Sequence, residues 1–233
     1  MKKVAILQSN YIPWKGYFDL INTVDEFIVY DEVQYTKRDW RNRNKIKGPE
    51  GLQWLSVPVE VKGKFHQKIC DVRITDKAIF KKHWMTINQF YRKAEFYKDY
   101  SDVFEEYYLG STSDYISEIN ISLIRRINNI LGIETKISSS RDYIFSGGKT
   151  EKIIEICKQS GADIYLSGPA AKGYFDTDMA EKEGIKVEWF DYSGYPEYRQ
   201  LYGRFVHGVT ILDLIFNEGP NAVCYMKSFQ NGH

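Results

Sequence analysis

Short apolar runs alternate with amphipathic segments at the start of this chain. Residues 4–8 (VAILQ) and 27–33 (FIVYDEV) are apolar runs of strand length, and apolar residues recur at helical spacing between Trp14 and Val24. A strand, a helix and a second strand within about 30 residues form a βαβ unit, whose strands are parallel and whose connection is right-handed. The opening segment therefore predicts a parallel sheet.

The same alternation returns after residue 132. ETKISSS, DIYLSG and VEWFDY have strand character, and KTEKIIEICKQSGA, MAEKEG and VTILDLIFNEG have helical spacing with a glycine at or near the end. We therefore predict an α/β fold with an open, mostly parallel sheet, built from residues 1–49 and 133–233.

The middle of the chain has a different pattern. LQWLSVPVEV and QKICDVRIT, joined by KGKFH, predict a β-hairpin with a long turn, in which Pro58 marks an edge strand or an irregularity. Asp76 is placed to cap a helix through FKKHWMTINQFYRK, and two more helical stretches follow up to about Leu131. Residues 50–132 therefore predict an inserted hairpin and helical subdomain.

Composition and charge narrow the class of protein. The chain is 43% hydrophobic and 27% charged, as folded globular proteins are, and its net charge of +1 favours no nucleic-acid partner. No apolar run approaches the roughly 20 residues that cross a bilayer, and no signal peptide is evident, so we expect a cytoplasmic protein. Neither the three cysteines nor the four histidines have the spacing of a metal site.

Polar residues gather where the predicted strands end. In open α/β sheets, ligands bind outside the carboxyl ends of the strands. The loops at these ends, with the aromatic residues of SNYIPWKGY as the floor, predict a cleft that binds substrate through Gln8, Asn10, Tyr11, Trp14, Gly16, Tyr17, Ser167, Gly168, Lys172 and Tyr174.

The stretch from Gln34 to Lys47 is strongly basic. It holds six lysines and arginines and one acid, a local charge of +5, and in extended backbone Asn42 and Asn44 would share one face while Arg41 and Arg43 share the other. Arginine binds phosphate oxygens in pairs, so this loop predicts a phosphate or diphosphate clamp. A solvated basic surface is the plain alternative, and the interleaved Trp40 leaves RNA binding as a third.

The catalytic candidates come from three segments. His83, on the predicted helix after Asp76, is the predicted proton-transfer group, because histidine titrates near neutral pH; a structural histidine beside an aromatic stripe is the alternative. Arg43 and Lys37 would stabilise charge on phosphate. Asp31, at the end of the second strand, would accept a hydrogen bond from a ribose hydroxyl, orient a basic side chain or cap a turn. Neither G-x-G-x-x-G nor the P-loop pattern occurs in the first loop.

Several segments together resemble the WbqC-like protein family. They are QSNYIPWKGYFDLI, FIVYDEVQYTKRDWRNRNKIK, LQWLSVPV, KHWMTINQFYRKAEFY, ICKQSGADIYLSGPAAKGYFD and FVHGVTILDLIFNEGP, which run nearly end to end. The family's opening has proline after the glutamine, where this chain has Ser9. The resemblance implies a role in O-antigen or other surface-polysaccharide biosynthesis.

A second resemblance concerns the first strand–helix junction. P-W-K-G-Y is similar to the His-x-Gly-His junction of nucleotidylyltransferases and pantothenate synthetase-like ligases, with Pro13 or Trp14 and Tyr17 in the histidine places and Gly16 kept. It implies a Rossmann-like, nucleotidylyltransferase-like sheet.

The predicted function is that of an enzyme, a transferase or ligase, acting on a nucleotide-activated amino sugar. No cofactor is predicted beyond a nucleotide or nucleotide sugar as substrate, and the oligomeric state stays open. The alternatives are a non-catalytic nucleotide-sugar-binding protein of the same pathway and an RNA-binding module.

Overall fold

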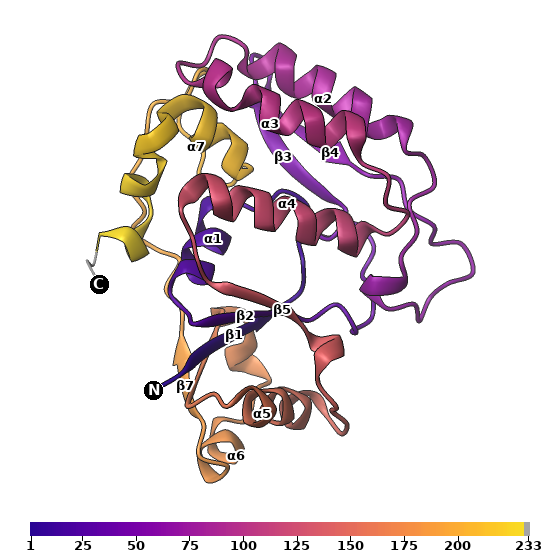
Figure 1. The fold of residues 1–233 in the computed structure, drawn as a ribbon, viewed down its shortest axis with the longest axis vertical. Helices are drawn as coiled ribbons and strands as arrows, with labels where there is room; N and C mark the ends of the chain where they lie inside the picture. Colours follow the sequence, from indigo (N-terminus) through magenta and orange to yellow (C-terminus); the bar gives the residue numbers. More distant parts are fainter. Residues whose placement is uncertain (231–233) are drawn as a thin grey trace.

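The computed structural model describes residues 1–230 and has a parallel five-stranded sheet at its centre (Figure 1). The strands lie in the order β5-β2-β1-β6-β7, so the order reverses between β1 and β6. Every neighbouring pair is parallel, with Ala5 of β1 opposite both Phe27 of β2 and Leu166 of β6. The strands are β1 (Lys3–Leu7), β2 (Glu26–Val29), β5 (Lys136–Ser139), β6 (Ile164–Ser167) and β7 (Lys186–Trp189).

Helices cover both faces of this sheet (Figure 1). On one face lie α1 (Lys15–Asn22), α4 (Ile116–Leu131) and α7 (Ile211–Glu218). On the other lie α5 (Lys149–Ser160) and α6 (Thr177–Lys182), over a smaller core that includes Ile156 and Tyr165. Right-handed crossovers explain the arrangement, because connections that run in opposite directions from the reversal point place their helices on opposite faces. The predicted α/β class with a mostly parallel sheet is therefore confirmed.

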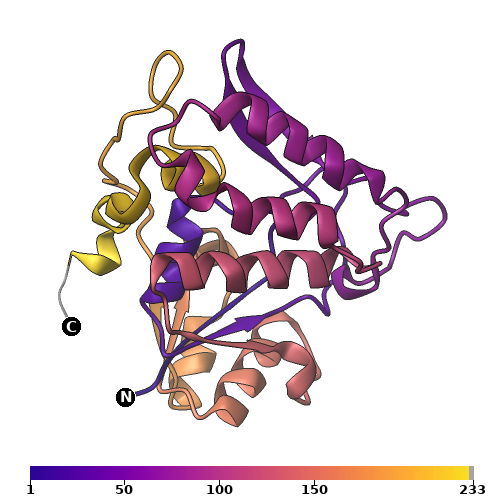
Figure 2. The same cartoon turned by 45° about the horizontal axis from the view of Figure 1, so that its top comes forward.

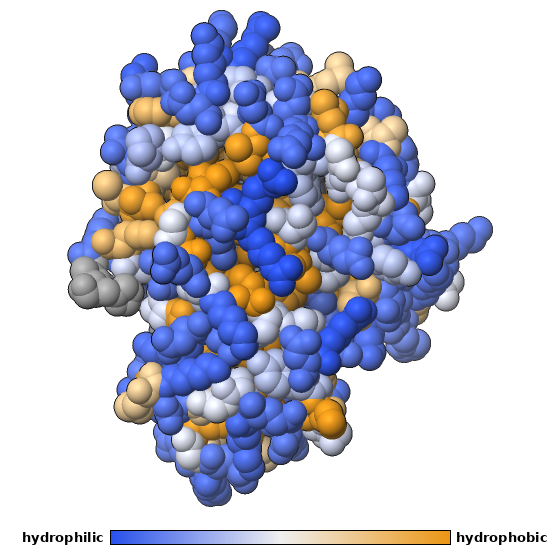
Figure 3. All heavy atoms as spheres, in the orientation of Figure 1, coloured by the Kyte–Doolittle hydropathy of each residue, from blue (hydrophilic) through white to orange (hydrophobic). Residues whose placement is uncertain are grey.

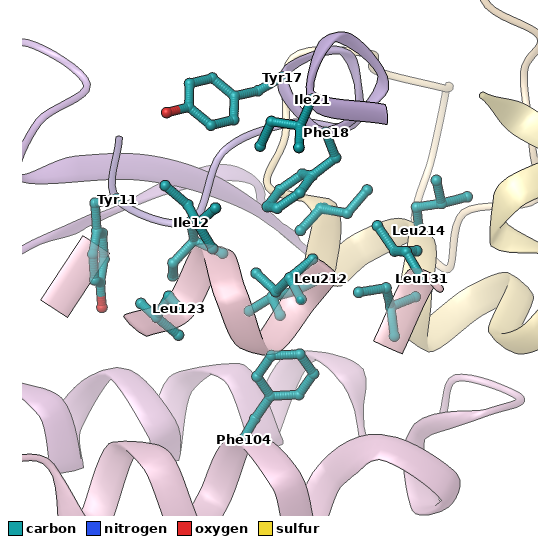
Figure 4. Close-up of a cluster of buried hydrophobic side chains, with 14 of the residues drawn as sticks. Tyr11, Ile12, Tyr17, Phe18, Ile21, Phe104, Leu123, Leu131, Leu212 and Leu214 are labelled. Carbon is teal, nitrogen blue, oxygen red and sulfur yellow. The ribbon is translucent and has the colours of Figure 1, made fainter. Parts of the chain in front are cut away.

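The middle of the chain adds a helical layer above α4 (Figures 1 and 2). It contains α2 (Ala78–Tyr91) and α3 (Tyr97–Gly110) together with an antiparallel hairpin of β3 (Arg43–Gly48) and β4 (Gly51–Ser56). Figure 4 shows Phe104 of α3 pointing toward the leucines of α4 and α7. One hydrophobic core thus joins this layer to the sheet, since it contains residues of β1, α1, α2, α3, α4 and α7. The division at residues 49 and 132 stays a prediction.

The hairpin differs from its prediction. We expected residues 52–61 to pair with 67–75, but β4 pairs with β3 instead, with Lys45 opposite Trp54. The two expected partners form one isolated bridge, between Val59 and Ile74, and the Gln67 side chain donates to the Glu60 carbonyl (2.7 Å). Ile69–Asp71 is a 3-10 turn. The physical reason is that every position of Arg43–Gly48 is buried or half-buried, so the segment packs against the core as a strand, although its charge favoured a loop.

A long connection without helix or strand, residues 190–210, links β7 to α7. It is tied to α1 and α7 by hydrogen bonds from Lys15 Nζ to the Pro196 carbonyl (2.8 Å), from the Tyr195 hydroxyl to Asp19 (2.6 Å) and from the Tyr198 hydroxyl to Asp213 (2.8 Å). These contacts hold the connection in one place, which matters because its end contributes to the site described below.

The visible surface is mostly hydrophilic, and the hydrophobic residues on the face shown in Figure 3 gather around its middle. Across residues 1–230, none of the helices combines the length and the apolar character needed to span a bilayer.

Candidate ligand-binding site

A buried carboxylate organises the loop between β1 and α1. Asp31, at the end of β2, is 4% exposed and accepts hydrogen bonds from the Ser9 backbone N–H (2.8 Å), from the Ser9 hydroxyl (2.6 Å) and from Ser117 of α4. All of these donors are protein groups, so the carboxylate is committed to holding the loop in place. None of these donors is a basic side chain, and the contact of Asp31 with a ribose hydroxyl stays a prediction.

Trp14 lies back over the start of α1, and Gly16 permits this. A Cβ atom at Gly16 would lie 2.4 Å from the Trp14 ring, well inside van der Waals contact. The Tyr17 hydroxyl donates to the Gln8 carbonyl (3.0 Å), which fixes the other side of the same loop. Gly16 and Tyr17 therefore fix the conformation of the loop between β1 and α1, and Tyr17 is buried.

A cavity of about 490 Å³ lies at the strand ends, and we call it the switch-point cavity because it lies where the strand order reverses. Its walls come from the carboxyl ends of β1 and β6, from the segments after β2 and β6, and from the first turn of α5. The lining residues are Ile6, Leu7, Gln8, Tyr30, Val33, Gln34, Lys149, Lys152, Ile153, Tyr165, Ser167, Gly168, Ala170, Ala171, Tyr174 and Phe175.

The charge of the switch-point cavity is positive. Lys149 and Lys152 line it, and none of its lining residues is an aspartate or glutamate. The Lys149 ammonium lies 5.1 Å from the centre of the Tyr174 ring, at the exposed side. Both lysines stand in the first turn of α5, where helix amide groups also favour negative charge. Glu151 of the same turn does not line the cavity, and its carboxylate lies against Gly148. The cavity therefore suits an anionic ligand.

A second hollow of about 310 Å³ lies on the other side of the β1–α1 loop. We call it the tryptophan cavity, and it is lined by Asn10, Pro13, Trp14, Trp40, Asn44, His207 and Gly208. Trp40 is 43% exposed at its mouth, and Asn44 is buried, with its amide donating to the carbonyls of Tyr11 (3.1 Å) and Ile12 (2.8 Å). Residues of the first junction and of the basic segment thus line one hollow.

The two cavities are neighbours. Gln8 lines one and Asn10 the other, with only the buried Ser9 between them. A Cβ atom at Gly168 of the switch-point cavity would lie 3.6 Å from the Tyr192 ring, and that ring is 5.6 Å from the Trp14 ring of the tryptophan cavity. The loop 8–10 and Tyr192 therefore form the shared boundary between the two hollows.

Side chains of the predicted phosphate clamp are bonded to other parts of the protein. Arg41 donates to the Asn10 side chain and lies 3.5 Å from Asp39, while Asn42 accepts from Tyr35 (2.8 Å) and donates to the Val57 carbonyl (2.8 Å). These bonds hold the basic segment against the first loop.

The remaining basic side chains lie outside both cavities. The Arg43 guanidinium stacks 4.3 Å above the Trp54 ring and donates to the Arg38 carbonyl, and Lys37 is exposed. Lys172 is also exposed, with its ammonium 5.7 Å from the Trp189 ring. Ligand contact by Lys37, Arg43 and Lys172 stays a prediction that neither cavity's lining supports.

His83 and Tyr11 lie together in the hydrophobic core. Both are buried, and the Tyr11 hydroxyl lies 2.8 Å from His83 Nδ1 and 3.2 Å from the Tyr108 hydroxyl. Burial lowers the pKa of His83 to about 4, against the opposing effect of a hydrogen bond with the Ser56 backbone, so the ring is neutral at pH 7. Neither residue lines the switch-point cavity or the tryptophan cavity. The alternative of a structural histidine therefore fits the geometry.

The sequence analysis did not predict Lys149, Lys152 or His207 as site residues, although they line the two cavities. Lys149 and Lys152 follow Gly147 and Gly148, and a glycine pair before Lys-Thr at a helix start is a signal for anion binding that was available in the sequence. His207, by contrast, is far from Trp14 and Trp40 in the chain, so only folding could place it beside them.

The part of the chain that the structure describes contains no group of three or more histidine, cysteine, aspartate or glutamate side chains able to hold a metal ion. The fourth histidine, His233, lies outside the described residues.

Comparisons with known proteins agree with the resemblance seen in the sequence. The sequence model of the WbqC-like protein family matches residues 8–225. The uncharacterized protein Rv1507c of Mycobacterium tuberculosis (strain ATCC 25618 / H37Rv) is 49% identical over 227 residues, which cover 97% of this chain and 98% of the relative. No solved structure matches the chain.

Proposed function

This chain belongs to the WbqC-like protein family, and from that premise we propose that it binds a nucleotide-activated sugar with the phosphates at Lys149 and Lys152. The reaction we propose is group transfer or ligation on that sugar during surface-polysaccharide biosynthesis, in the cytoplasm. The fold we infer is Rossmann-like, because β5-β2-β1-β6-β7 corresponds to the first five strands of the 3-2-1-4-5-6 order.

One observation carries the proposal: a cavity at the strand-order reversal, with two lysines and no acid in its lining. Doubly wound sheets bind nucleotides at this place, and a diphosphate needs cationic partners when it leaves water. The tyrosines at positions 30, 165 and 174 supply flat, partly polar walls suited to a base or ribose.

The same cavity supports a second candidate, a protein that binds the nucleotide sugar without turnover. No histidine or carboxylate lines it, and burial raises the pKa of Tyr165 and Tyr30, so these hydroxyls stay protonated. A proton-transfer group would therefore have to come from outside the switch-point cavity. Product formation with a sugar acceptor, followed by chromatography, separates the two candidates.

The binding test uses calorimetry with ADP, CDP, GDP, UDP and dTDP and their sugar conjugates. We expect micromolar affinity for at least one of them. The double variant Lys149→Ala, Lys152→Ala should lose about tenfold or more, because each charged contact contributes about 1 kcal/mol or more. Lys182→Ala removes an exposed lysine of α6 that lines neither cavity and is the matched control. Binding no tighter than millimolar, or equal affinity in all variants, contradicts the proposal.

RNA binding is a further candidate supported by a separate observation on the hairpin. Arg43 and Lys45 both lie over the Trp54 ring, at 4.3 and 4.8 Å, and Trp54 and Trp40 are exposed. Aromatic and basic side chains together suit single-stranded nucleic acid. Affinity for an oligonucleotide that falls steeply with salt would support it, and a shallow dependence would remove it.

A further inference from the structure

The tryptophan cavity is a second, distinct hollow whose lining differs in kind from that of the switch-point cavity. It contains no lysine, arginine, aspartate or glutamate, and its walls include two indole rings and a proline ring. A cavity without charged side chains favours an uncharged ligand, because a buried charge without a partner is costly. The part of a ligand that fits here therefore carries neither phosphate nor carboxylate.

The polar groups of the tryptophan cavity are few and fixed in position. Asn10 is held through its side-chain oxygen, which accepts from Arg41, and within residues 1–230 its amide nitrogen donates to no other residue. The His207 ring packs edge-on against Phe205, with 4.5 Å between ring centres, and its side chain likewise makes no hydrogen bond to the described residues. One amide donor and one imidazole beside flat apolar walls match a ring that has both hydroxyl groups and C–H faces.

The volume and the position of the cavity agree with a single ring. At about 310 Å³ it is at the lower end of the roughly 300–1,000 Å³ typical of small-molecule sites, so it holds a part of a ligand and not a whole dinucleotide. Its lining residue Asn10 is two positions along the chain from Gln8, which lines the switch-point cavity. One ligand would therefore have its phosphates at α5 and its ring on the other side of the 8–10 loop.

We infer that the tryptophan cavity is the subsite for the neutral pyranose ring of the ligand, with Trp14 and Trp40 against its C–H face and Asn10 and His207 at its hydroxyls. This assignment rests on the proposed function and divides the ligand between two hollows: the nucleoside diphosphate in the switch-point cavity and the sugar in the tryptophan cavity. A nucleobase, which is also flat and uncharged, is the competing occupant that the test must separate.

The test is Trp40→Ala, a variant expected to fold because this side chain is 43% exposed. Calorimetry compares the tightest-binding diphosphate of the panel with its glucose, galactose and N-acetylglucosamine conjugates. We expect the best conjugate to bind about tenfold more weakly to the variant, and the diphosphate alone to bind within twofold of wild type. Phe65→Ala, which removes an aromatic ring that is 71% exposed and lines neither cavity, is the matched control and should change neither affinity.

Two results would overturn the assignment. An equal loss of affinity for the diphosphate and its conjugates would place the base in the tryptophan cavity, and an unchanged affinity for both would leave the cavity outside the site. If no nucleotide binds the wild-type protein, the proposed function fails on its own. Saturation-transfer NMR with the three free sugars then tests the cavity directly: transfer to ring protons that is lost in Trp40→Ala supports a sugar site, and its absence in wild type refutes it.

Discussion

Glu26 is the first residue of β2, which lies between β5 and β1, and its carboxylate offers a quantitative test of what holds the strands together. The side chain is 1% exposed and forms ion pairs with Lys2 (2.7 Å) and Lys136 (3.0 Å), and the Tyr143 hydroxyl donates to it (2.9 Å). Burial by itself would raise its pKa, but the hydrogen bonds from Lys2, Lys136 and Tyr143 outweigh burial and lower the pKa from 4.5 to about 2.

The lowered pKa converts into a free energy of folding. A difference of 2.5 between 4.5 and about 2 corresponds to about 3 kcal/mol at 1.36 kcal/mol per pKa unit. Because the folded-state pKa is depressed, this stability is fully present above pH 4.5 and is lost as the pH falls toward 2. Glu26→Gln removes the charge but keeps the shape of the side chain. At pH 7 the variant should therefore be about 3 kcal/mol less stable than the wild type, and near pH 3 this difference should be about half as large.

Urea unfolding of the wild type and the variant at several pH values measures this difference directly. The control is Glu188→Gln in β7, which also pairs with two lysines, Lys3 (2.8 Å) and Lys186 (2.7 Å), but has a side chain that is 28% exposed. Solvent screens this pair, so the control should lose less than about 1 kcal/mol. A loss at Glu26 that is below 1 kcal/mol, or that does not change with pH, would refute the reasoning.

Three further variants test the site and its supports. Gly16→Ala should lose about 1–3 kcal/mol in urea unfolding and alter tryptophan fluorescence, because its Cβ would lie 2.4 Å from the Trp14 ring; unchanged stability would mean that the ring moves aside freely. Asp31→Ala should lose about 3 kcal/mol or more, since the Ser9 groups that it accepts from are left unpaired in a buried place, and a loss under 1 kcal/mol would contradict that role. His83→Ala should unfold more easily but keep its nucleotide-sugar affinity within twofold by calorimetry, because His83 lines neither cavity; a tenfold loss of affinity in the folded variant would restore His83 to the site.

The sheet and its helices could be predicted because their signals are local. VAILQ, FIVYDEV and DIYLSG are apolar runs that need burial on both faces, and the observed strands lie within a residue or a few of these runs. Gly161 ends α5 with a backbone φ of 70°, a conformation that glycine adopts without strain. The end of this helix could therefore also be predicted from the sequence.

The pairing of the hairpin strands could not be predicted in the same way, because it depends on contacts between the side chains of two strands and not on the pattern within one. Lys45 and Trp54 are a cross-strand pair, and the Arg43 guanidinium stacks on the Trp54 ring, but the local pattern of charges predicts neither contact. A basic stretch that looked solvated therefore became a strand against the core, and its asparagines became structural hydrogen-bond donors.

By itself the sequence determined that strand ends carry the polar residues, because the periodicity of apolar positions fixes where each strand stops. Only the tertiary structure decided which polar residues face an open cavity, namely Lys149, Lys152, Trp40 and His207, and which ones, such as Asp31 and His83, are buried among partners. The physical reason is that a polar side chain must be hydrogen-bonded wherever it is buried, and its available partners come from segments distant in the chain, which only the folded arrangement brings near.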